Sequence, residues 1–144
     1  MKKTVLLMLL AVIVTINVSA QCKKRILLTS ATTQYMDDAG AVADSRPENV
    51  SIVITDSGLV VTISAEGQEA HDLTGKISSY TCDWKVPFKE GKTVIKSLLA
   101  DPRGDERNAT MTIEGKNGKI SFLAEIEGEQ RKIALVVDKF EEKK

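Results

Sequence analysis

Apolar and polar residues alternate in the last third of the chain. The alternation covers residues 111–113, resumes at 120–126 and returns at 133–137, with Asn-Gly at 117–118. A period of two is typical of a strand that buries one face, and Asn-Gly is the strongest short signal of a hairpin. The pattern therefore predicts three consecutive antiparallel strands.

A second hairpin is predicted before the middle of the chain. Residues 50–54 carry Val or Ile at every second position, Asp-Ser-Gly follows at 56–58, and residues 59–63 alternate again. Turn residues between two alternating runs are the sequence pattern of a hairpin.

Four further segments complete the predicted fold. Residues 24–30 and 71–77 fit strands, and residues 33–49 resemble a long loop. Residues 92–100 fit a strand or one face of a helix, and the β-branched residues near their start favour the strand. Seven or eight short strands without a helix predict an all-β fold. We expect an antiparallel up-and-down meander that closes into a small barrel or forms a two-sheet sandwich.

The first 20 residues have a different pattern. Lys2 and Lys3 precede an apolar run, and small residues at Val18 and Ala20 mark a cleavage site after Ala20. This order is typical of a secretory signal peptide. We therefore expect residues 1–20 to be removed and residues 21–144 to form one β domain. That domain is expected in the periplasm or outside the cell, with no membrane span after processing.

Two cysteines, Cys22 and Cys82, remain after this cleavage. A lipid anchor requires the cysteine directly after the cut, and Gln21 stands there instead, so we expect no lipid anchor. In an oxidising compartment, an even pair of cysteines predicts a disulfide bond. A Cys22–Cys82 bond closes a loop of about 60 residues and stabilises the fold by roughly 4 kcal/mol on the chain-entropy model.

Charge and composition limit the choice of partner. The chain holds 20 basic and 20 acidic residues, and the signal peptide takes two lysines and no acid, which leaves 18 and 20 and a net charge of about −2. The lysines alternate with acids, and aromatic residues are few. The basic, aromatic-rich stripe of a nucleic-acid-binding protein is therefore missing from the sequence.

Residues for catalysis or metal binding are scarce. His71 is the only histidine, and we expect it at the surface, at the start of a strand, because a single histidine is no catalytic constellation. One histidine and two oxidised cysteines do not make a zinc site. The acids of residues 37–44 lack the spacing of a calcium loop. We therefore expect a protein that is not an enzyme and has no cofactor or metal.

Two short segments carry candidate contact residues. Trp84 and Phe88 follow Cys82 closely, and a tryptophan beside a disulfide is expected to pack in the core. The alternative is that both contact a ligand or a partner. Arg103 and Asp105 belong to an Arg-Gly-Asp sequence that some animal cell-surface receptors bind in exposed loops, and a charged turn explains the same residues.

The signal ending in Ala-Gln, the segment NVSIVITDSGLVVTI at 49–63 and the later hairpins resemble the uncharacterised small secreted β-domain proteins of Bacteroidetes. The resemblance implies export and a β fold, and it implies no activity and no site residues. The chain departs from lipocalins, because residues 24–30 contain neither the glycine nor the tryptophan of their first strand. It also departs from periplasmic lysozyme inhibitors, because Ser57 and Gly58 are not followed by their tyrosine.

Three functions follow as hypotheses. The first is an exported, non-catalytic domain that binds a protein or cell-envelope partner through a sheet face or a loop. The alternative is a lipocalin-like carrier of a small apolar ligand, with Trp84 and Phe88 near the mouth of a barrel; it requires a pocket of a few hundred cubic ångströms. The third is a hydrolase that uses His71, and an unchanged activity after His71→Ala excludes it.

Overall fold

The structure is a computed structural model that describes residues 25–143. The expected signal peptide, residues 1–20, and Cys22 lie outside the described residues. The described part is all-β and antiparallel, as predicted. Its strands are β1 (Arg25–Ser30), β2 (Thr33–Met36), β3 (Val42–Arg46), β4 (Glu48–Ile54), β5 (Gly58–Ala65), β6 (His71–Val86), β7 (Glu90–Ala100), β8 (Glu106–Lys116), β9 (Lys119–Ile126), β10 (Lys132–Leu135) and β11 (Lys139–Lys143). No helix long and apolar enough to cross a membrane occurs between residues 25 and 143.

All eleven strands belong to one sheet, in the order β11-β1-β4-β5-β6-β7-β8-β9-β10-β2-β3. From β4 to β10 each strand pairs with the next one along the chain, as expected of a meander. The predicted hairpins are present in β4–β5 and in β8–β9–β10, and residues 92–100 are a strand rather than a helix. β6 is longer than predicted and extends to Val86, with register shifts near Ile77 and Trp84.

The structure corrects the predicted strand number and closure. Residues 25–143 contain eleven strands instead of seven or eight, and these strands form one sheet instead of two. The sheet is not closed into a barrel, because its hydrogen-bonded order ends at the edge strands β11 and β3. The predicted loop at 33–49 contains β2, β3 and the start of β4. β3 was not predicted because it is short, largely polar and mostly exposed, so its sequence shows no alternation of apolar and polar residues.

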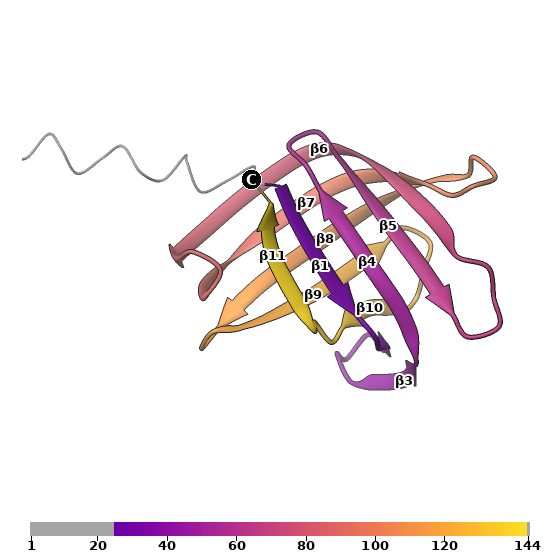
Figure 1. Ribbon diagram of the computed structural model, residues 1–144, viewed down its shortest axis with the longest axis horizontal. Coiled ribbons are helices and arrows are strands. Elements are labelled where there is room, and N and C mark those ends of the chain that lie inside the picture. Colours follow the sequence, from indigo (N-terminus) through magenta and orange to yellow (C-terminus); the bar gives the residue numbers. More distant parts are fainter. Residues whose placement is uncertain (1–24, 144) are drawn as a thin grey trace, which may run out of the picture.

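A bend at Ala31 and Thr32 curves the sheet strongly. β1 pairs with β4 and β11, whereas β2, which begins three residues later, pairs with β10 and β3. The bend therefore brings the two ends of the meander together. Figure 1 shows the result: β1, β4 and β5 lie in front of β7, β8 and β9, so that one face of the sheet encloses the interior. The carboxylate of Asp138 accepts a hydrogen bond of 2.6 Å from the backbone N–H of Ala31 and supports the bend.

Side chains fill the end of the interior near the β6–β7 turn. Trp84 lies edge-on to Phe88, with ring centroids 5.3 Å apart, and Phe88 contacts Phe140 at 4.9 Å. The three rings pack against the buried aliphatic core, whose members include Ile95 and Ile113. Inward-facing residues alternate with outward-facing ones along each strand, because successive side chains of a strand point to opposite faces.

Candidate functional site

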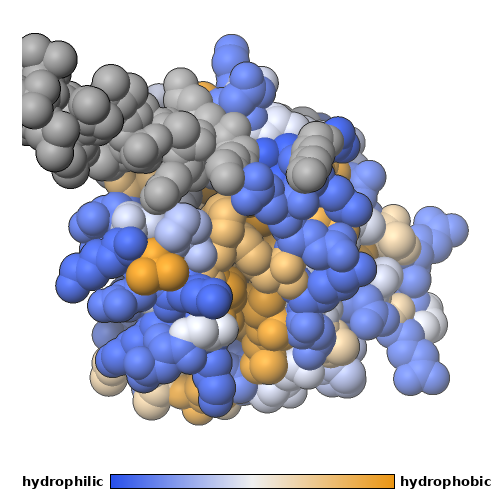
Figure 2. All heavy atoms as spheres, turned by 60° about the vertical axis from the view of Figure 1, so that its left-hand side comes forward, coloured by the Kyte–Doolittle hydropathy of each residue, from blue (hydrophilic) through white to orange (hydrophobic). Residues whose placement is uncertain are grey.

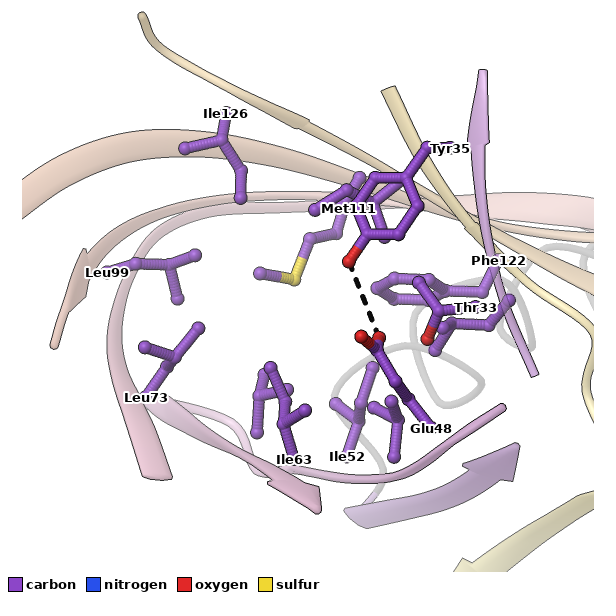
Figure 3. A pocket seen from close by; sticks show the side chains of 15 residues that line it. Thr33, Tyr35, Glu48, Ile52, Ile63, Leu73, Leu99, Met111, Phe122 and Ile126 are labelled. Atoms are coloured by element: carbon purple, nitrogen blue, oxygen red, sulfur yellow. Dashed lines mark hydrogen bonds between the residues drawn. The ribbon is translucent and has the colours of Figure 1, made fainter. Parts of the chain in front are cut away.

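The other end of the interior contains a cavity (Figure 3). A water-sized molecule can occupy about 70 Å³ of it, and the space between the atoms is about 490 Å³ when the part open to solvent is included. Fifteen residues from eight strands line it: Thr33, Tyr35, Glu48, Val50, Ile52, Val61, Ile63, Leu73, Leu99, Met111, Phe122, Ala124, Ile126, Ile133 and Leu135. Many of them are two residues apart on one strand, such as Val61 and Ile63, because the pleat turns alternate side chains to the same face.

Most of the cavity wall is apolar. Twelve of the fifteen lining residues are aliphatic, aromatic or Met, and the three with polar groups are Thr33, Tyr35 and Glu48. Figure 3 shows Leu73, Leu99 and Ile63 on the side opposite Tyr35, with the polar groups gathered on one side. We call Thr33, Tyr35 and Glu48 the polar corner. An apolar cavity with a few convergent polar groups is the usual form of a small-molecule site.

The polar corner joins strands that are not neighbours in the sheet order. The Tyr35 hydroxyl, on β2, donates a hydrogen bond of 3.4 Å to Glu48 Oε2, on β4. Burial raises the pKa of Tyr35 above its ordinary value, and the nearby negative charge of Glu48 raises it further. The guanidinium of Arg46 lies 4.8 Å from the centre of the Tyr35 ring, and Arg46 Nε also bonds Asp44 at 2.9 Å.

Charged side chains surround the mouth of the cavity. A hollow next to the cavity shares five of its lining residues, among them Tyr35 and Leu99, and adds Asp101, Asp105, Arg107 and Glu129. Arg107 and Glu129 form an ion pair with each other. The interior is therefore apolar, and its entrance is polar and carries paired charges.

Trp84 and Phe88 do not line this cavity. They lie in the aromatic cluster at the opposite end of the interior, where the indole N–H of Trp84 donates a 2.8 Å hydrogen bond to Thr93 Oγ1. Both rings pack against the core. Their alternative role, contact with a ligand or a partner, stays a prediction and does not concern this cavity. The reason is the direction of β6: Trp84 is near its end, whereas the mouth is near its start.

Arg103 and Asp105 lie in the β7–β8 turn, beside the mouth. The carboxylate of Asp101 accepts hydrogen bonds from the backbone N–H groups of Arg103, at 2.8 Å, and Asp105, at 3.0 Å. It also bonds the guanidinium of Arg103 at 3.1 Å. The Arg-Gly-Asp segment therefore forms a turn with its own internal bonds, and Asp105 lines the hollow at the mouth.

His71 and Cys82 are both on β6 and lie far from each other along it. His71 is exposed at the first position of the strand, opposite Ile63. Cys82 Sγ accepts a hydrogen bond of 3.6 Å from Thr93 Oγ1, and its bond to Cys22 stays a prediction because Cys22 lies outside the described residues. Between residues 25 and 143, no group of three or more His, Cys, Asp or Glu side chains is placed to hold a metal ion.

Sequence reasoning missed the polar corner. Its three residues fell in the segment 33–49 that resembled a loop. The sequence did contain a signal. Glu48 lies two residues before Val50, in the same spacing as Val50, Ile52 and Ile54, and this spacing predicts that its side chain faces the interior. Thr33 and Tyr35 have the same spacing on β2.

A second hollow lies between β9 and β11, at the end of the interior that holds the aromatic cluster. Apolar side chains are exposed in a depression between hydrophilic ones in Figure 2. The groove is formed by residues 116–121 of the β8–β9 hairpin and by residues 135–138 with Phe140; we call it the β9–β11 groove. Ile120, Val137 and Phe140 supply its apolar floor.

Comparisons with protein-family models, with curated proteins and with solved structures found no match to this chain. The resemblance to secreted Bacteroidetes proteins therefore stays a prediction. The function must be inferred from the cavity, the groove and the residues that form them.

Proposed function

We propose that this protein is an exported, non-catalytic carrier that holds a small apolar ligand in the cavity of its curved sheet. The observation that carries the proposal is the apolar cavity itself, lined from eight strands and open beside a charged rim. The cavity offers about 70 Å³ to a bound molecule, so a ligand would extend from it into the adjoining hollow, which offers about 350 Å³; small-molecule sites usually measure roughly 300–1,000 Å³.

The energetics favour an apolar occupant. An apolar ligand in this cavity loses contact with water, which stabilises the complex by about 25 cal/mol per Å² of buried apolar surface. The lining side chains also gain dispersion contacts that an open space does not offer them. The polar groups are confined to one corner and the rim, so most of the ligand surface would meet hydrocarbon.

Native mass spectrometry of the exported protein, purified without denaturant, tests the proposal. We expect a small molecule of reproducible mass on the wild type, or uptake of an apolar fluorescent dye when the host supplies no ligand. Ala124→Leu places a larger side chain on the cavity wall and is expected to abolish both.

Ala134→Leu is the matched control. Ala134 lies on β10 between the cavity-lining residues Ile133 and Leu135, so its side chain points away from the cavity. The same substitution there is expected to leave binding unchanged. Equal binding by wild type and Ala124→Leu, or no uptake of any apolar dye by the folded wild type, contradicts the carrier proposal.

A protein or cell-envelope partner is a second candidate function, and the β9–β11 groove favours it. β11 is an edge strand, and β10 pairs with β9 only over residues 122–124, so residues 119–121 of β9 extend past it. An extended segment of a partner could add to such an edge, with its apolar side chains on Ile120, Val137 and Phe140. The charged side chains of β11, such as Lys139 and Glu141, oppose unspecific pairing at that edge.

Site-specific crosslinking in the exporting cell tests this second function. A photoreactive residue at Ser121, which is exposed in the groove, is expected to capture one reproducible partner. The same residue at Val60, exposed on β5 and outside the groove, serves as the control. Identical products from both positions contradict a partner site in the groove.

A further inference from the structure

The polar corner contains a hydroxyl that the protein leaves without a partner. Thr33 is only 2% exposed, and its Oγ1 has no hydrogen-bond partner. Figure 3 shows this oxygen on the same side of the cavity as Glu48 and Tyr35. Buried hydroxyls are nearly always hydrogen-bonded. The polar group of a bound molecule would therefore form the hydrogen bond that the Thr33 hydroxyl lacks.

Glu48 offers further acceptor capacity at the same place. The Tyr35 hydroxyl is a long 3.4 Å from Glu48 Oε2. A carboxylate has about four acceptor positions and no donor. The Tyr35 hydroxyl has a single proton, directed to Glu48, and its oxygen can still accept. The corner therefore presents mainly acceptors to a ligand, and only Thr33 can donate without breaking an existing bond.

Charged side chains of both signs lie around the polar corner. Arg46 is the cation nearest to Tyr35, and it is exposed and bonded to Asp44. At the mouth, Asp101, Asp105 and Glu129 line a hollow, and each is paired: Arg103 pairs with Asp101 and Asp105, and Arg107 pairs with Glu129. Glu48 therefore supplies the negative charge inside the cavity, which favours a neutral or cationic ligand over an anionic one.

We propose that the cavity selects apolar molecules whose polar end donates hydrogen bonds, an ammonium or a hydroxyl, and discriminates against apolar carboxylates. This inference rests on the proposed carrier function and names its ligand class. The donor end would bond Glu48 and Thr33, while the hydrocarbon part would contact the apolar wall opposite. We expect a ligand with an ammonium group to bind most tightly, because a hydrogen bond between opposite charges is about twice as strong as a hydrogen bond between neutral groups.

Octylamine, octanol and octanoate test this proposal, since they share one hydrocarbon chain and differ only in the polar end. Isothermal titration calorimetry of the full folded protein at neutral pH is expected to rank octylamine first and octanoate last. Their Kd values should differ by about tenfold or more, as expected for gain or loss of one charged hydrogen bond.

Glu48→Gln is the decisive variant, because it keeps the shape of the side chain and removes its charge. The ratio of the octylamine and octanoate affinities is expected to fall close to one in Glu48→Gln and to stay unchanged in Glu114→Gln, on the outer face of β8. Thr33→Val is expected to weaken the binding of octanol, because it removes the hydroxyl that would bond the octanol oxygen. Circular dichroism confirms that each variant is folded.

The outcomes separate the two proposals. Equal affinity for all three compounds, or tightest binding of octanoate, overturns the head-group selection and leaves the carrier function standing. Binding of none of them, together with no uptake of apolar dye, overturns the carrier function itself. A preference for octylamine that survives in Glu48→Gln assigns the selection to the charged rim and overturns the role given to Glu48.

Discussion

The indole N–H of Trp84 and the hydroxyl of Thr93 form a 2.8 Å hydrogen bond between the neighbouring strands β6 and β7. Thr93 is 2% exposed, so this bond is buried at the end of the interior that lies away from the cavity mouth. The same hydroxyl donates to Cys82 Sγ. One threonine therefore links the tryptophan, the predicted disulfide and the filled end of the sheet.

Thr93→Val removes this acceptor while keeping the volume of the side chain. We expect the free energy of unfolding to fall by about 1–3 kcal/mol, because the indole N–H is left without a partner in a buried place. Urea denaturation followed by circular dichroism measures the change. Thr81→Val, at an exposed position of β6, is the control and should change the free energy of unfolding by less than about 0.5 kcal/mol. Equal losses in the two variants would show that the hydrogen bond contributes little.

Gly115→Ala tests how tightly Trp84 is packed. A Cβ atom at Gly115 would lie 2.7 Å from Trp84 Cζ3 and 3.1 Å from the carbonyl carbon of Lys89. Since the indole or the backbone must shift, we expect a loss of about 1–3 kcal/mol, which is typical of overpacking. The midpoint of urea unfolding should fall, and ligand binding in the distant cavity should stay within a factor of about two of the wild type. An unchanged midpoint is the result that contradicts this packing.

We predict that the free energy of unfolding falls in alkali because of two tyrosines, Tyr35 and Tyr80. Burial is the largest cause that raises the pKa of each above the ordinary value of 10.0. The folded protein therefore holds these protons more tightly than the unfolded chain does. The stabilisation is complete below pH 10 and is lost as the pH rises through the raised pKa values of the folded state.

Ultraviolet titration of the phenolate checks this prediction. Ionisation of both tyrosines in the native protein should occur at higher pH than in protein unfolded in urea. Tyr80→Phe removes one raised group, so its free energy of unfolding should decline less steeply above pH 10 than that of the wild type. Coincident titration curves for native and unfolded protein would contradict the burial of the phenols.

The predicted Cys22–Cys82 bond is tested by mass. Protein exported by a bacterial host is expected to begin at Gln21 and to weigh about two hydrogens less than the fully reduced chain. An alkylating reagent should modify neither cysteine before reduction and both after it. Cys82→Ser is expected to lower the free energy of unfolding by roughly 4 kcal/mol, the chain-entropy value for a loop of this length. A mass increased by hundreds of daltons would instead identify a lipid on Cys22.

Local pattern was enough to locate most of the strands. Val50, Ile52 and Ile54 alternate with smaller or exposed neighbours, and their strand, with its inward face, follows from that spacing. The same reasoning failed for β3, because none of its residues is fully buried. It also underestimated β6, whose second half is irregular near Ile77 and Trp84.

The polar corner and the position of Trp84 could not be predicted from local pattern. Tyr35 and Glu48 are separated by the whole of β3, and they meet because β2 and β4 approach each other after the bend at residues 31–32. Trp84 was expected to pack in the core, with a ligand mouth as the alternative; it packs against the core at the end of the interior opposite the cavity, because it lies near the end of β6. Both results depend on which strands pair and in which order.

By itself, the sequence determined that the chain forms antiparallel strands and which side chains of those strands are buried. The physical reason is local: side chains two residues apart lie on one face of a strand, and apolar side chains leave water together. Only the tertiary structure decided that the buried face encloses a cavity with a polar corner. The space left inside depends on the curvature of the whole sheet and on contacts between residues as distant as Thr33 and Leu135, which no short stretch of sequence contains.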